Sequence, residues 1–382
     1  MRIAYVLPKL LRPSGWRTYV VALMQSIQEY VEPVIIVSAE DAAEARSLFP
    51  EWPVYILPVT QSAALSNPRG LLALLRCYRA ISSGAFPEVD LVHSLEAYPT
   101  GLVGSWLSRR LGCPHALTAH GTYGVVWHDL FLDRLAYRGV LRHASLVLPV
   151  SQGTERLVRR YFGSELADAR VHVILNGNDF TKRVPQQQAL ERSWPDVPTL
   201  LSVGDVKPRK GQQHSLEAFA RVKKEIPQVR YWIVGNYRQN EYYLQMQRYI
   251  AENHLRNVSF FGTVIGDELD RLYRQASLFV LTPKQEGLSF EGFGLVYLEA
   301  GAYGLPVVAT RSGGVPDAVK DGLTGLLADP GDVEGIAAAL LRLLTDPDLL
   351  RRMGRENRLW AESLTWERNA AEHYRAYQEL LQ

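Results

Sequence analysis

Short runs of apolar, often β-branched residues alternate along the whole chain with longer segments of helical periodicity. In the first half these runs predict strands at 3–7, 33–37, 54–57, 91–93, 115–119, 146–149 and 171–175. Helices are predicted between them, for example at 19–30, 71–82, 100–111 and 153–161. Strands that alternate with helices of this length are typical of parallel βαβ units, in which helices cover both faces of the sheet.

The alternation stops over 176–196, a polar segment that lacks periodicity and contains Pro185 and three consecutive glutamines. It then starts again, with strands predicted at 199–203, 230–234, 258–261, 278–281 and 306–309 and helices at 212–225, 241–253, 267–276 and in a helical tail. The chain has 382 residues, too many for one ordinary core. We therefore predict an α/β protein with a doubly wound domain at 1–178, a linker at 179–197 and a second doubly wound domain at 198–365.

The stretch SFEGFGLVYLEA, residues 289–300, places a glycine-containing turn and an apolar helix between Glu291 and Glu299. Ligands of open α/β sheets bind at such loops, beyond the carboxyl ends of strands. The glycines let the backbone approach a ligand, and N–H groups of Phe293, Gly294 and Leu295 at the helix start would hold a phosphate oxygen. The two carboxylates suit hydroxyls at both ends of that ligand. The alternative is one acid that stabilises the helix terminus and one exposed glutamate.

Other strand-end loops carry residues of matching chemistry. In SVGDVKPRKG, residues 202–211, the basic side chains suit an anion, although a solvated basic turn is the alternative. His120 in TAHGTYG directly follows a predicted strand, although a lone histidine is more often structural. In RPSGW, residues 12–16, Gly15 allows close approach to a phosphate or forms a simple turn. The loop Ser312-Gly313-Gly314 is expected to shape the floor of the site.

Composition narrows the class of protein only moderately. The 42 basic and 40 acidic residues leave a net charge of +2, which gives no support for nucleic-acid binding. Two cysteines without metal-ligand spacing argue against a disulfide framework or a zinc site and fit a reducing cytosol. The first apolar run is too short for a signal peptide, and no run approaches the roughly 20 apolar residues of a membrane span.

We therefore expect a cytoplasmic protein. Peripheral contact with the inner face of a membrane stays open, because several arginines of the first domain fall on predicted helices. They are Arg76, Arg79, Arg109, Arg110, Arg156, Arg159 and Arg160. Ordinary solvated helices are the alternative.

Several reaction classes lack their motif in this chain. No GxGxxG follows the first strand and no GxxxxGK[ST] occurs, which argues against a dinucleotide oxidoreductase and a P-loop NTPase. Asp346-Pro347-Asp348 is better explained as a helix-capping turn than as a metal site. We expect a metal-independent reaction in which cationic side chains and helix dipoles stabilise a leaving diphosphate.

Together these stretches resemble the retaining glycosyltransferases of the GT-B fold, group 1 or family 4 type, over nearly the whole chain. The resemblance is strongest over 199–332, where EGFGLVYLEA, GLPVVAT, GGVPDAV and DGLTGLL follow the family's order and spacing. It implies two Rossmann-like domains that face each other across a cleft, the first for the acceptor and the second for a nucleotide-diphosphate sugar. It also implies that a final helix, about 366–382, packs back on the first domain.

The resemblance assigns roles residue by residue. Glu299 would accept hydrogen bonds from the ribose and Glu291 from the transferred sugar, while His120 would lie near the anomeric region. Further contacts to the donor would come from Arg209, Lys210, Gly15 and Phe293–Leu295 at the diphosphate and from Gly262, Thr263 and Val264 at the base. No cofactor or metal is implied, and the donor is expected to be a UDP- or GDP-sugar. The acceptor would be a glycan, a lipid-linked sugar or a small molecule.

Two positions depart from the family pattern, and three other functions remain open. Asp205 stands where many members have arginine, and Trp16 stands where many have glycine. Asp205 puts one end of the donor pocket in question. Trp16 puts the donor contact at Gly15 in question. The alternatives are a related enzyme such as an epimerase or phosphorylase, a glycoside hydrolase that uses the two glutamates, and a non-catalytic sugar-nucleotide binder.

Overall fold

In the computed structural model the chain forms two compact units, each built around one parallel sheet. Unit 1 contains Met1–Gly177 and Trp366–Gln382, and unit 2 contains Asn178–Thr365. The structure describes residues 1–382 except 8–9, 11–14, 59–63, 126–129 and 238–239. The polar segment expected as a linker lies within unit 2, where two short helices in it, α7 (Phe180–Arg183) and α8 (Gln186–Leu190), pack against α15 (Pro347–Ser363).

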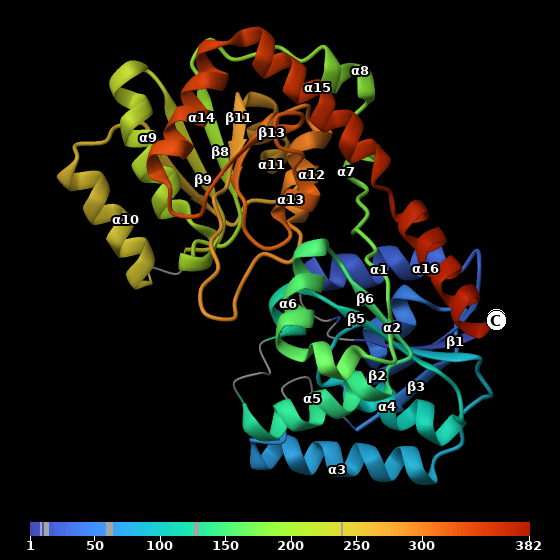
Figure 1. Ribbon diagram of the computed structural model, residues 1–382. Coiled ribbons are helices and arrows are strands. Elements are labelled where there is room, and N and C mark those ends of the chain that lie inside the picture. Colours follow the sequence, from blue (N-terminus) through green and yellow to red (C-terminus); the bar gives the residue numbers. More distant parts are fainter. Residues whose placement is uncertain (8–9, 11–14, 59–63, 126–129, 238–239) are drawn as a thin grey trace. The chain divides into compact units, whose positions relative to one another are not determined.

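The sheet of unit 1 has the strand order β3-β2-β1-β4-β5-β6-β7 (Figure 1). Its strands are β1 (Arg2–Val6), β2 (Glu32–Ser38), β3 (Val54–Leu57), β4 (Leu91–Ser94), β5 (His115–Ala119), β6 (Leu146–Pro149) and β7 (Arg170–Val171). All of these pairs are parallel. The strands are almost continuously apolar because both faces of a parallel sheet are covered by helices.

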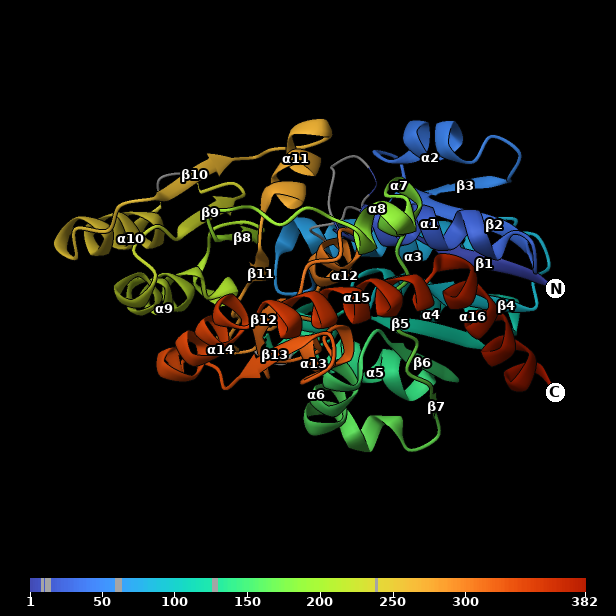
Figure 2. The ribbon, with the colours of Figure 1, turned by 90° about the horizontal axis from the view of Figure 1, so that it is seen from above.

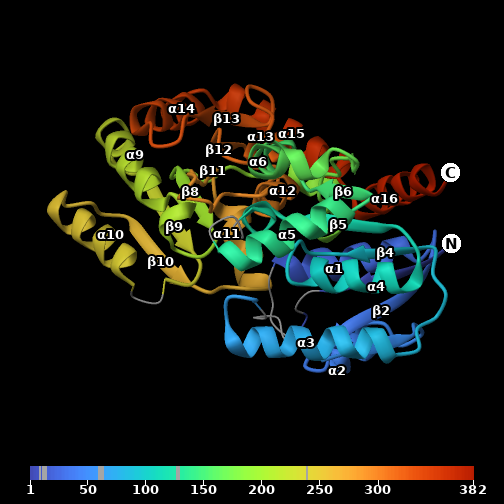
Figure 3. The ribbon, with the colours of Figure 1, turned by 60° about the horizontal axis from the view of Figure 1, so that its bottom comes forward.

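Two helical layers cover this sheet. Its helices are α1 (Gly15–Ile27), α2 (Ala42–Leu48), α3 (Pro68–Ser83), α4 (Thr100–Leu111), α5 (Phe131–His143), α6 (Gln152–Phe162) and α16 (Trp366–Leu381), with 3₁₀ turns η1 (Gly121–Gly124) and η3 (Gly163–Leu166). Helices α3, α4 and α5 form one layer, with α4 packed against both neighbours (Figures 1 and 3). Helices α1 and α16 lie side by side in the other layer (Figures 1 and 2).

The sheet of unit 2 has the order β10-β9-β8-β11-β12-β13, and its pairs are also parallel. Its strands are β8 (Thr199–Val203), β9 (Arg230–Val234), β10 (Val258–Gly262), β11 (Leu278–Val280), β12 (Val307–Thr310) and β13 (Gly325–Ala328). Its further helices are η4 (Pro208–Lys210), α9 (Gln212–Glu225), α10 (Glu241–Glu252), α11 (Asp267–Gln275), α12 (Leu295–Ala302), α13 (Val315–Ala318) and α14 (Val333–Thr345). Helices α9 and α14 lie side by side (Figures 1 and 2) and bury Phe219 and Leu340 in one core with Ile233 and Val308 of the sheet.

Most predicted strands and helices are observed within a few residues of their expected ends. The prediction of a strand over 171–175 was wrong in extent, since β7 ends at Val171. His172 and Ile174 still donate backbone hydrogen bonds to Val147 and Pro149 of β6, at 3.0 Å each, so the chain continues along this edge beyond the regular strand. The capping turn before α15 is confirmed, because Oδ1 of Asp346 accepts a 2.9 Å hydrogen bond from the N–H of Leu349.

The strand order of each sheet reverses at one point. In unit 1 the reversal lies between β1 and β4, and in unit 2 between β8 and β11. At such a point the loops from two neighbouring strands diverge to opposite faces and leave room for a ligand at the carboxyl edge. Among the described residues, no helix combines the length and the apolar character needed to cross a bilayer.

Candidate active site

Three loops of unit 2 meet at the carboxyl edge of its sheet, where the strand order reverses. They follow β8, β11 and β12 and end at α9, α12 and α13. The first two are in contact: a Cβ added to Gly211 would lie 1.8 Å from the carbonyl oxygen of Thr282. The N–H of Lys284 also donates a 3.0 Å hydrogen bond to the carbonyl of Arg209. The sequence places Gly211 here because its φ of +72° and this close contact exclude a side chain.

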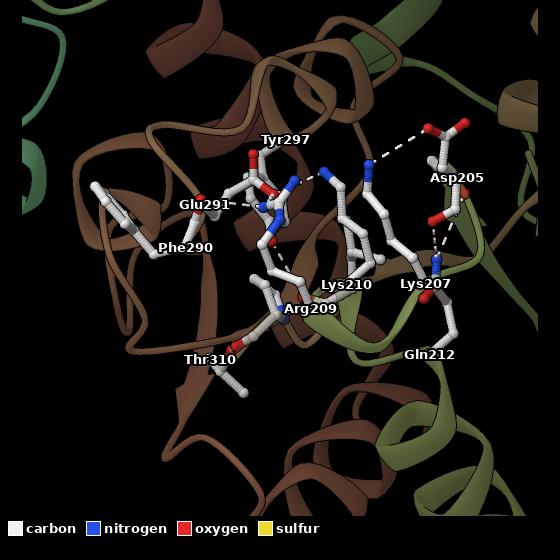
Figure 4. Close-up of polar contacts among 12 residues, drawn as sticks. Asp205, Lys207, Arg209, Lys210, Gln212, Phe290, Glu291, Tyr297 and Thr310 are labelled. Atoms are coloured by element: carbon white, nitrogen blue, oxygen red, sulfur yellow. Dashed lines mark hydrogen bonds and ion pairs between the residues drawn. The ribbon is translucent and has the colours of Figure 1, made fainter. Parts of the chain in front are cut away.

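Glu291 forms the centre of these loops (Figure 4). Its Oε2 atom accepts hydrogen bonds from Nζ of Lys210 at 2.7 Å and from Nη1 of Arg209 at 2.9 Å. Arg209 also donates to the carbonyl oxygen of Phe290 at 3.2 Å. The structure therefore brings together three residues that the sequence singled out separately, from positions about 80 residues apart.

The three side chains form a cluster with a formal charge of +1. They are 12% exposed at Glu291, 19% at Arg209 and 12% at Lys210. Burial alone would raise the pKa of Glu291, but the neighbouring Lys210 and Arg209 outweigh it, so its pKa lies below the ordinary value. Glu291 is therefore ionised at neutral pH, and it orients both cations.

The backbone of Glu291 is fixed by the glycines of the third loop. The N–H of Gly314 donates a 2.8 Å hydrogen bond to the carbonyl oxygen of Glu291. Gly313 has a φ of +56°, and a Cβ there would lie 2.3 Å from the same carbonyl oxygen. The glycine pair that we expected at the floor of the site thus holds the residue at its centre.

The amino terminus of α12 lies beside Glu291 in the sequence. The helix begins at Leu295, somewhat later than the sequence suggested, because Gly294 adopts a left-handed φ of +93° immediately before it. Among the described residues, none accepts a hydrogen bond from the N–H groups of Phe293, Gly294 or Leu295. Unpaired N–H groups and the positive end of the helix dipole are suited to an anion.

Glu299 has a different set of neighbours from Glu291. It lies near Tyr273 and Asp270 of α11 and Arg183 of α7. Burial raises the pKa of Glu299 to about 7, against the opposing influence of Tyr273 and Arg183. Glu299 can therefore change charge near neutral pH, and its part in holding the same ligand as Glu291 stays a prediction.

Glycines end three neighbouring strands at this edge. Gly204 follows β8, Gly235 follows β9, and Gly262 ends β10. Gly204 donates its N–H to Val234 at 2.8 Å, and Gly235 donates to Gly262 at 2.7 Å. A Cβ on Gly235 would lie 2.1 Å from the carbonyl oxygen of Gly204. The backbones of these strand ends therefore pack closely and leave no room for a side chain at Gly235. The expected base-binding residues Gly262, exposed Thr263 and buried Val264 lie at the β10 end of this edge.

In unit 1, His120 follows β5 and is almost fully buried. Its Nε2 atom donates a 3.0 Å hydrogen bond to the carbonyl of Leu95, so Nδ1 is the acceptor nitrogen. Burial lowers the pKa of His120 to about 4, and the ring is neutral at physiological pH. Its ring lies 4.4 Å from that of Tyr19 in an edge-to-face arrangement.

The chain is similar to known proteins over most of its length. Residues 186–360 match the family described as Glycosyl transferases group 1, and residues 13–182 match Glycosyltransferase Family 4. The GDP-mannose-dependent alpha-(1-6)-phosphatidylinositol monomannoside mannosyltransferase of Mycolicibacterium smegmatis is 32% identical over 282 residues, 72% of each chain. The chain belongs to the group 1 glycosyltransferases. A second relative of this glycosyltransferase, the D-inositol 3-phosphate glycosyltransferase of Corynebacterium jeikeium, is 32% identical over 314 residues, 76% of this chain and 72% of the relative.

Solved structures show the fold of the glycosyltransferase. Anabaena HepE in complex with UDP and glucose superposes with a TM-score of 0.72 at 19% identity, over 99% of this chain and 100% of that one. Sucrose-phosphate synthase from Thermosynechococcus elongatus superposes with a TM-score of 0.74 at 23% identity, over 99% and 98% of the two chains. The predicted GT-B fold of two Rossmann-like domains is confirmed.

The two residues that depart from the family pattern have defined contacts in this glycosyltransferase. Asp205 is largely exposed and pairs with Lys207, whose Nζ lies 3.4 Å from its carboxylate (Figure 4). Lys207 is thus engaged away from Glu291, while Arg209 and Lys210 reach it. Trp16 packs edge-to-face on Tyr123, with ring centroids 4.5 Å apart, and lies 6.2 Å from the ring of His120.

Gly15 is the first residue of α1, and no described atom lies within 4 Å of the position its Cβ would occupy. The described part of the fold therefore does not itself require glycine at this position. The three residues that precede Gly15 in the motif, Arg12, Pro13 and Ser14, lie outside the described residues. The expected donor contact at Gly15 stays a prediction.

Sequence reasoning missed Glu96 in the glycosyltransferase. This residue lies in the loop after β4 and is only 7% exposed. Burial raises its pKa well above the ordinary value, against a weaker opposing influence of Thr100. The preceding residue, Leu95, accepts the hydrogen bond of His120, so both lie at the carboxyl edge of unit 1. A carboxylate three residues after a predicted strand was the signal that could have found it.

Proposed function

We propose that this glycosyltransferase moves a hexose from a UDP- or GDP-hexose to an acceptor hydroxyl, with retention of the anomeric configuration and without a metal. The observation that carries the proposal is the cluster of Arg209, Lys210 and Glu291 at the switch point of unit 2. It combines two hydrogen-bonding cations with the unpaired N–H groups at the start of α12. Such a set is suited to a diphosphate, whose charge increases as the sugar leaves.

Each residue has a chemical role in this proposal. Arg209, Lys210 and the N–H groups of Phe293–Leu295 bind the diphosphate oxygens. Glu291 holds the two cations through Oε2 and offers Oε1 to a hydroxyl of the transferred sugar. Glu299 accepts hydrogen bonds from the ribose, and the base is bound at Gly262–Val264. His120, neutral and with Nδ1 as an acceptor, is assigned to the reacting sugar.

The transfer needs no protein nucleophile. The bond between the anomeric carbon and the diphosphate oxygen breaks, and a bond from the acceptor oxygen forms on the same face of the sugar. The proton of the acceptor hydroxyl passes to the leaving phosphate oxygen. The low pKa of Glu291 supports this division of roles, because an ionised carboxylate paired with two cations is a poor proton donor. This argues against the hydrolase alternative, in which Glu291 would supply a proton.

The names of similar proteins support the donor class. One relative is a GDP-mannose-dependent mannosyltransferase, and the HepE structures contain UDP or UDP-glucose. Both kinds of nucleotide are diphosphates, which is the feature that the cluster would recognise. The acceptor is proposed only by class, as a glycan, a lipid-linked sugar or a small molecule.

A donor screen tests the proposal. Thermal unfolding is measured with UDP-, GDP- and ADP-sugars in the presence of EDTA, and release of nucleoside diphosphate is followed with each. Stabilisation by one nucleotide sugar, with release of its diphosphate under EDTA and an unchanged anomeric configuration in the product, is expected. Binding without any release would instead indicate a non-catalytic binder. Release that requires a divalent cation would overturn the metal-independent mechanism.

A further inference from the structure

The outward side of α3 is apolar, although this helix lies at the surface. One side of α3 faces the core through Gly70, Leu74, Cys77 and Ile81. The opposite side exposes four large apolar residues, which are Leu71, Leu72, Leu75 and Tyr78, between 39% and 50% exposed. A surface helix normally carries polar residues on its outward side. Burial within unit 1 therefore does not explain this second apolar stripe.

Helix α5 adds a second group of exposed apolar residues. Leu130, Phe131, Leu132 and Leu135 lie at its amino-terminal end and are between 41% and 63% exposed. The fold ties this end to the start of α3, since the carboxylate of Asp133 accepts hydrogen bonds from the N–H groups of Leu65 at 2.7 Å and Ser66 at 3.1 Å. We call these eight residues on α3 and α5 the α3–α5 face.

Exposed large apolar side chains are concentrated on the α3–α5 face and are not spread evenly over the surface. Fifteen large apolar side chains are exposed among the described residues, and eight of them belong to this face. The remaining seven are divided among other elements of both units. Tyr78 also packs edge-to-face on Trp106 of α4, with centroids 5.3 Å apart, which places a further amphipathic aromatic ring beside the face.

The helices that carry the α3–α5 face expose basic and no acidic side chains. The layer of α3, α4 and α5 is seen in Figure 3. It contains eight arginines: Arg69, Arg76, Arg79, Arg109, Arg110, Arg134, Arg138 and Arg142. Its only acidic residue is Asp133, which is fully buried and bound to Leu65, Ser66 and Tyr98. Arg138 and Arg142 pair with Glu165, which is itself buried. Among the described residues, no carboxylate forms an ion pair with Arg69, Arg76 or Arg79.

We infer that the α3–α5 face docks on the surface of an anionic lipid bilayer. Exposed leucines and aromatic rings insert at the boundary of headgroups and acyl chains, while arginines bind the lipid phosphates. A second copy of the chain fits the face less well, because a two-fold interface would place the same positive surface against itself. The inference concerns unit 1 alone and does not depend on the proposed reaction.

Vesicle sedimentation of the full chain tests the inference. The protein is mixed with vesicles of phosphatidylcholine alone or with phosphatidylglycerol added, and the bound fraction is measured at low and high salt. Binding is expected only to the anionic vesicles and is expected to weaken with salt. The double change Arg76→Gln with Arg79→Gln is expected to reduce binding about thirty-fold, since each basic residue near an anionic surface contributes about fivefold.

Apolar variants and matched controls complete the test. Leu72→Ser with Leu75→Ser, and separately Phe131→Ser with Leu132→Ser, are expected to reduce binding at least about tenfold. The controls lie on unit 2: Leu244→Ser with Leu359→Ser, which are 42% and 47% exposed, and Arg352→Gln with Arg355→Gln on α15. They are expected to bind as the native protein does. All the changed positions are exposed, so each variant is expected to fold, which its thermal unfolding checks.

Three outcomes would overturn the inference. The first is failure of the native protein to bind anionic vesicles at low salt. The second is equal loss of binding in the α3–α5 variants and the unit 2 controls. The third is a dimer in light scattering that the Leu72→Ser, Leu75→Ser variant converts to a monomer, since a second copy would then cover the face.

Discussion

The Nζ atom of Lys210 lies 2.7 Å from Oε2 of Glu291, and each side chain is only 12% exposed. Arg209 shares the same oxygen at 2.9 Å. One buried carboxylate thus holds two cations that would otherwise repel each other. The cluster is therefore both a structural element of unit 2 and its proposed diphosphate site.

Glu291→Gln separates these two roles. The neutral amide leaves the two cations with a net charge of +2, so a nucleoside diphosphate is expected to bind at least as tightly as to the native protein. Transfer is expected to fall at least about 100-fold, because the cations and the sugar hydroxyl lose their orientation. The free energy of unfolding is expected to fall by about 1–3 kcal/mol. Calorimetric titration, transfer assays and urea unfolding measure the three quantities.

Glu286→Gln is the matched control, since Glu286 lies in the same loop and is exposed. It is expected to leave transfer, affinity and stability unchanged. Native rates of transfer in the Glu291→Gln variant would remove Glu291 from the site.

Lys210→Ala and Lys207→Ala test which lysine binds the donor. Lys210 is buried in the cluster, whereas Lys207 is 42% exposed and pairs with Asp205. Loss of Lys210 is expected to weaken binding of the nucleotide sugar at least about tenfold, the effect of about 1.4 kcal/mol. Loss of Lys207 is expected to change it less than about threefold. A larger effect at Lys207 would contradict the assignment.

Glu299 is expected to give nucleotide-sugar binding a pH dependence. Its pKa is raised by burial to about 7, so the carboxylate forms as the pH rises through 7 and becomes a stronger acceptor for ribose hydroxyls. Affinity is expected to increase from pH 6 to pH 8 in the native protein and to stay level in Glu299→Gln. A nucleotide sugar is the right probe because its diphosphate, esterified at both ends, does not titrate in this range. An identical pH profile in both proteins would exclude the ribose contact.

Glu299 also has a consequence for stability with a definite sign. Because its pKa in the folded state lies above the ordinary 4.5, the unfolded chain loses its proton first as the pH rises. The contribution of Glu299 to stability is therefore complete below pH 4.5 and is lost between pH 4.5 and about 7. Urea unfolding of the native protein and Glu299→Gln over this range is expected to show the difference.

Gly313→Ala is expected to disturb the site through the backbone of Glu291. A Cβ at Gly313 would lie 2.3 Å from the carbonyl oxygen of Glu291, and φ is +56°. Gly322 is the control, since it has a φ of +75° but no atom within 4 Å of its Cβ position. Gly322→Ala is expected to cost about 1 kcal/mol of stability and no activity. Gly313→Ala is expected to cost more stability and most of the transfer activity, and equal effects would contradict the role of Gly313.

Unit 1 is expected to lose stability in acid because it buries neutral histidines. Burial lowers the pKa of His120 and of His373 to about 4, from an ordinary 6.5. The unfolded chain therefore binds protons first as the pH falls, and stability decreases between pH 6.5 and about 4 by up to about 1.4 kcal/mol per pH unit for each histidine. Chemical unfolding at several pH values measures the slope.

His373→Gln is expected to make that slope shallower, because one titrating group is removed. His254→Gln, at an exposed position of unit 2, is expected to leave it unchanged. A slope that is the same in all three proteins would show that other groups cause the acid sensitivity.

The sequence predicted the sheets well because their strands are buried on both faces. Runs such as 115–119 and 199–203 are mainly apolar, are followed by a histidine or a glycine, and match β5 and β8 at both ends. The edge strand β7 was less predictable, because the β-branched run 171–175 continues after regular pairing ends. The pattern of apolar residues indicates which residues are buried. It does not indicate where regular pairing at a sheet edge ends, because that depends on the neighbouring strand.

The candidate site was predicted by residue type more than by contact. The spacing around Glu291, Arg209 and Lys210 indicated a phosphate site. The sequence did not show that one carboxylate oxygen binds both cations, because this contact depends on loops that the reversal of strand order brings together. Glu299 and its neighbours Tyr273 and Asp270 could not be paired from sequence, since helices α11 and α12 meet only in the fold. The sequence likewise could not show that one apolar side of α3 is exposed, because a helix with two apolar stripes has the same pattern as a fully buried helix.

Helix α16 belongs to unit 1, although every residue of unit 2 precedes it in the chain. It supplies Trp366, buried against Tyr19 of α1, and Tyr377, whose hydroxyl lies 2.7 Å from Nδ1 of His93. During synthesis on the ribosome, all of unit 2 can therefore emerge and fold while unit 1 still lacks one of its covering helices. The unit that is begun first is completed last, and until then the side of its sheet under α16 is exposed to chaperones and to premature association.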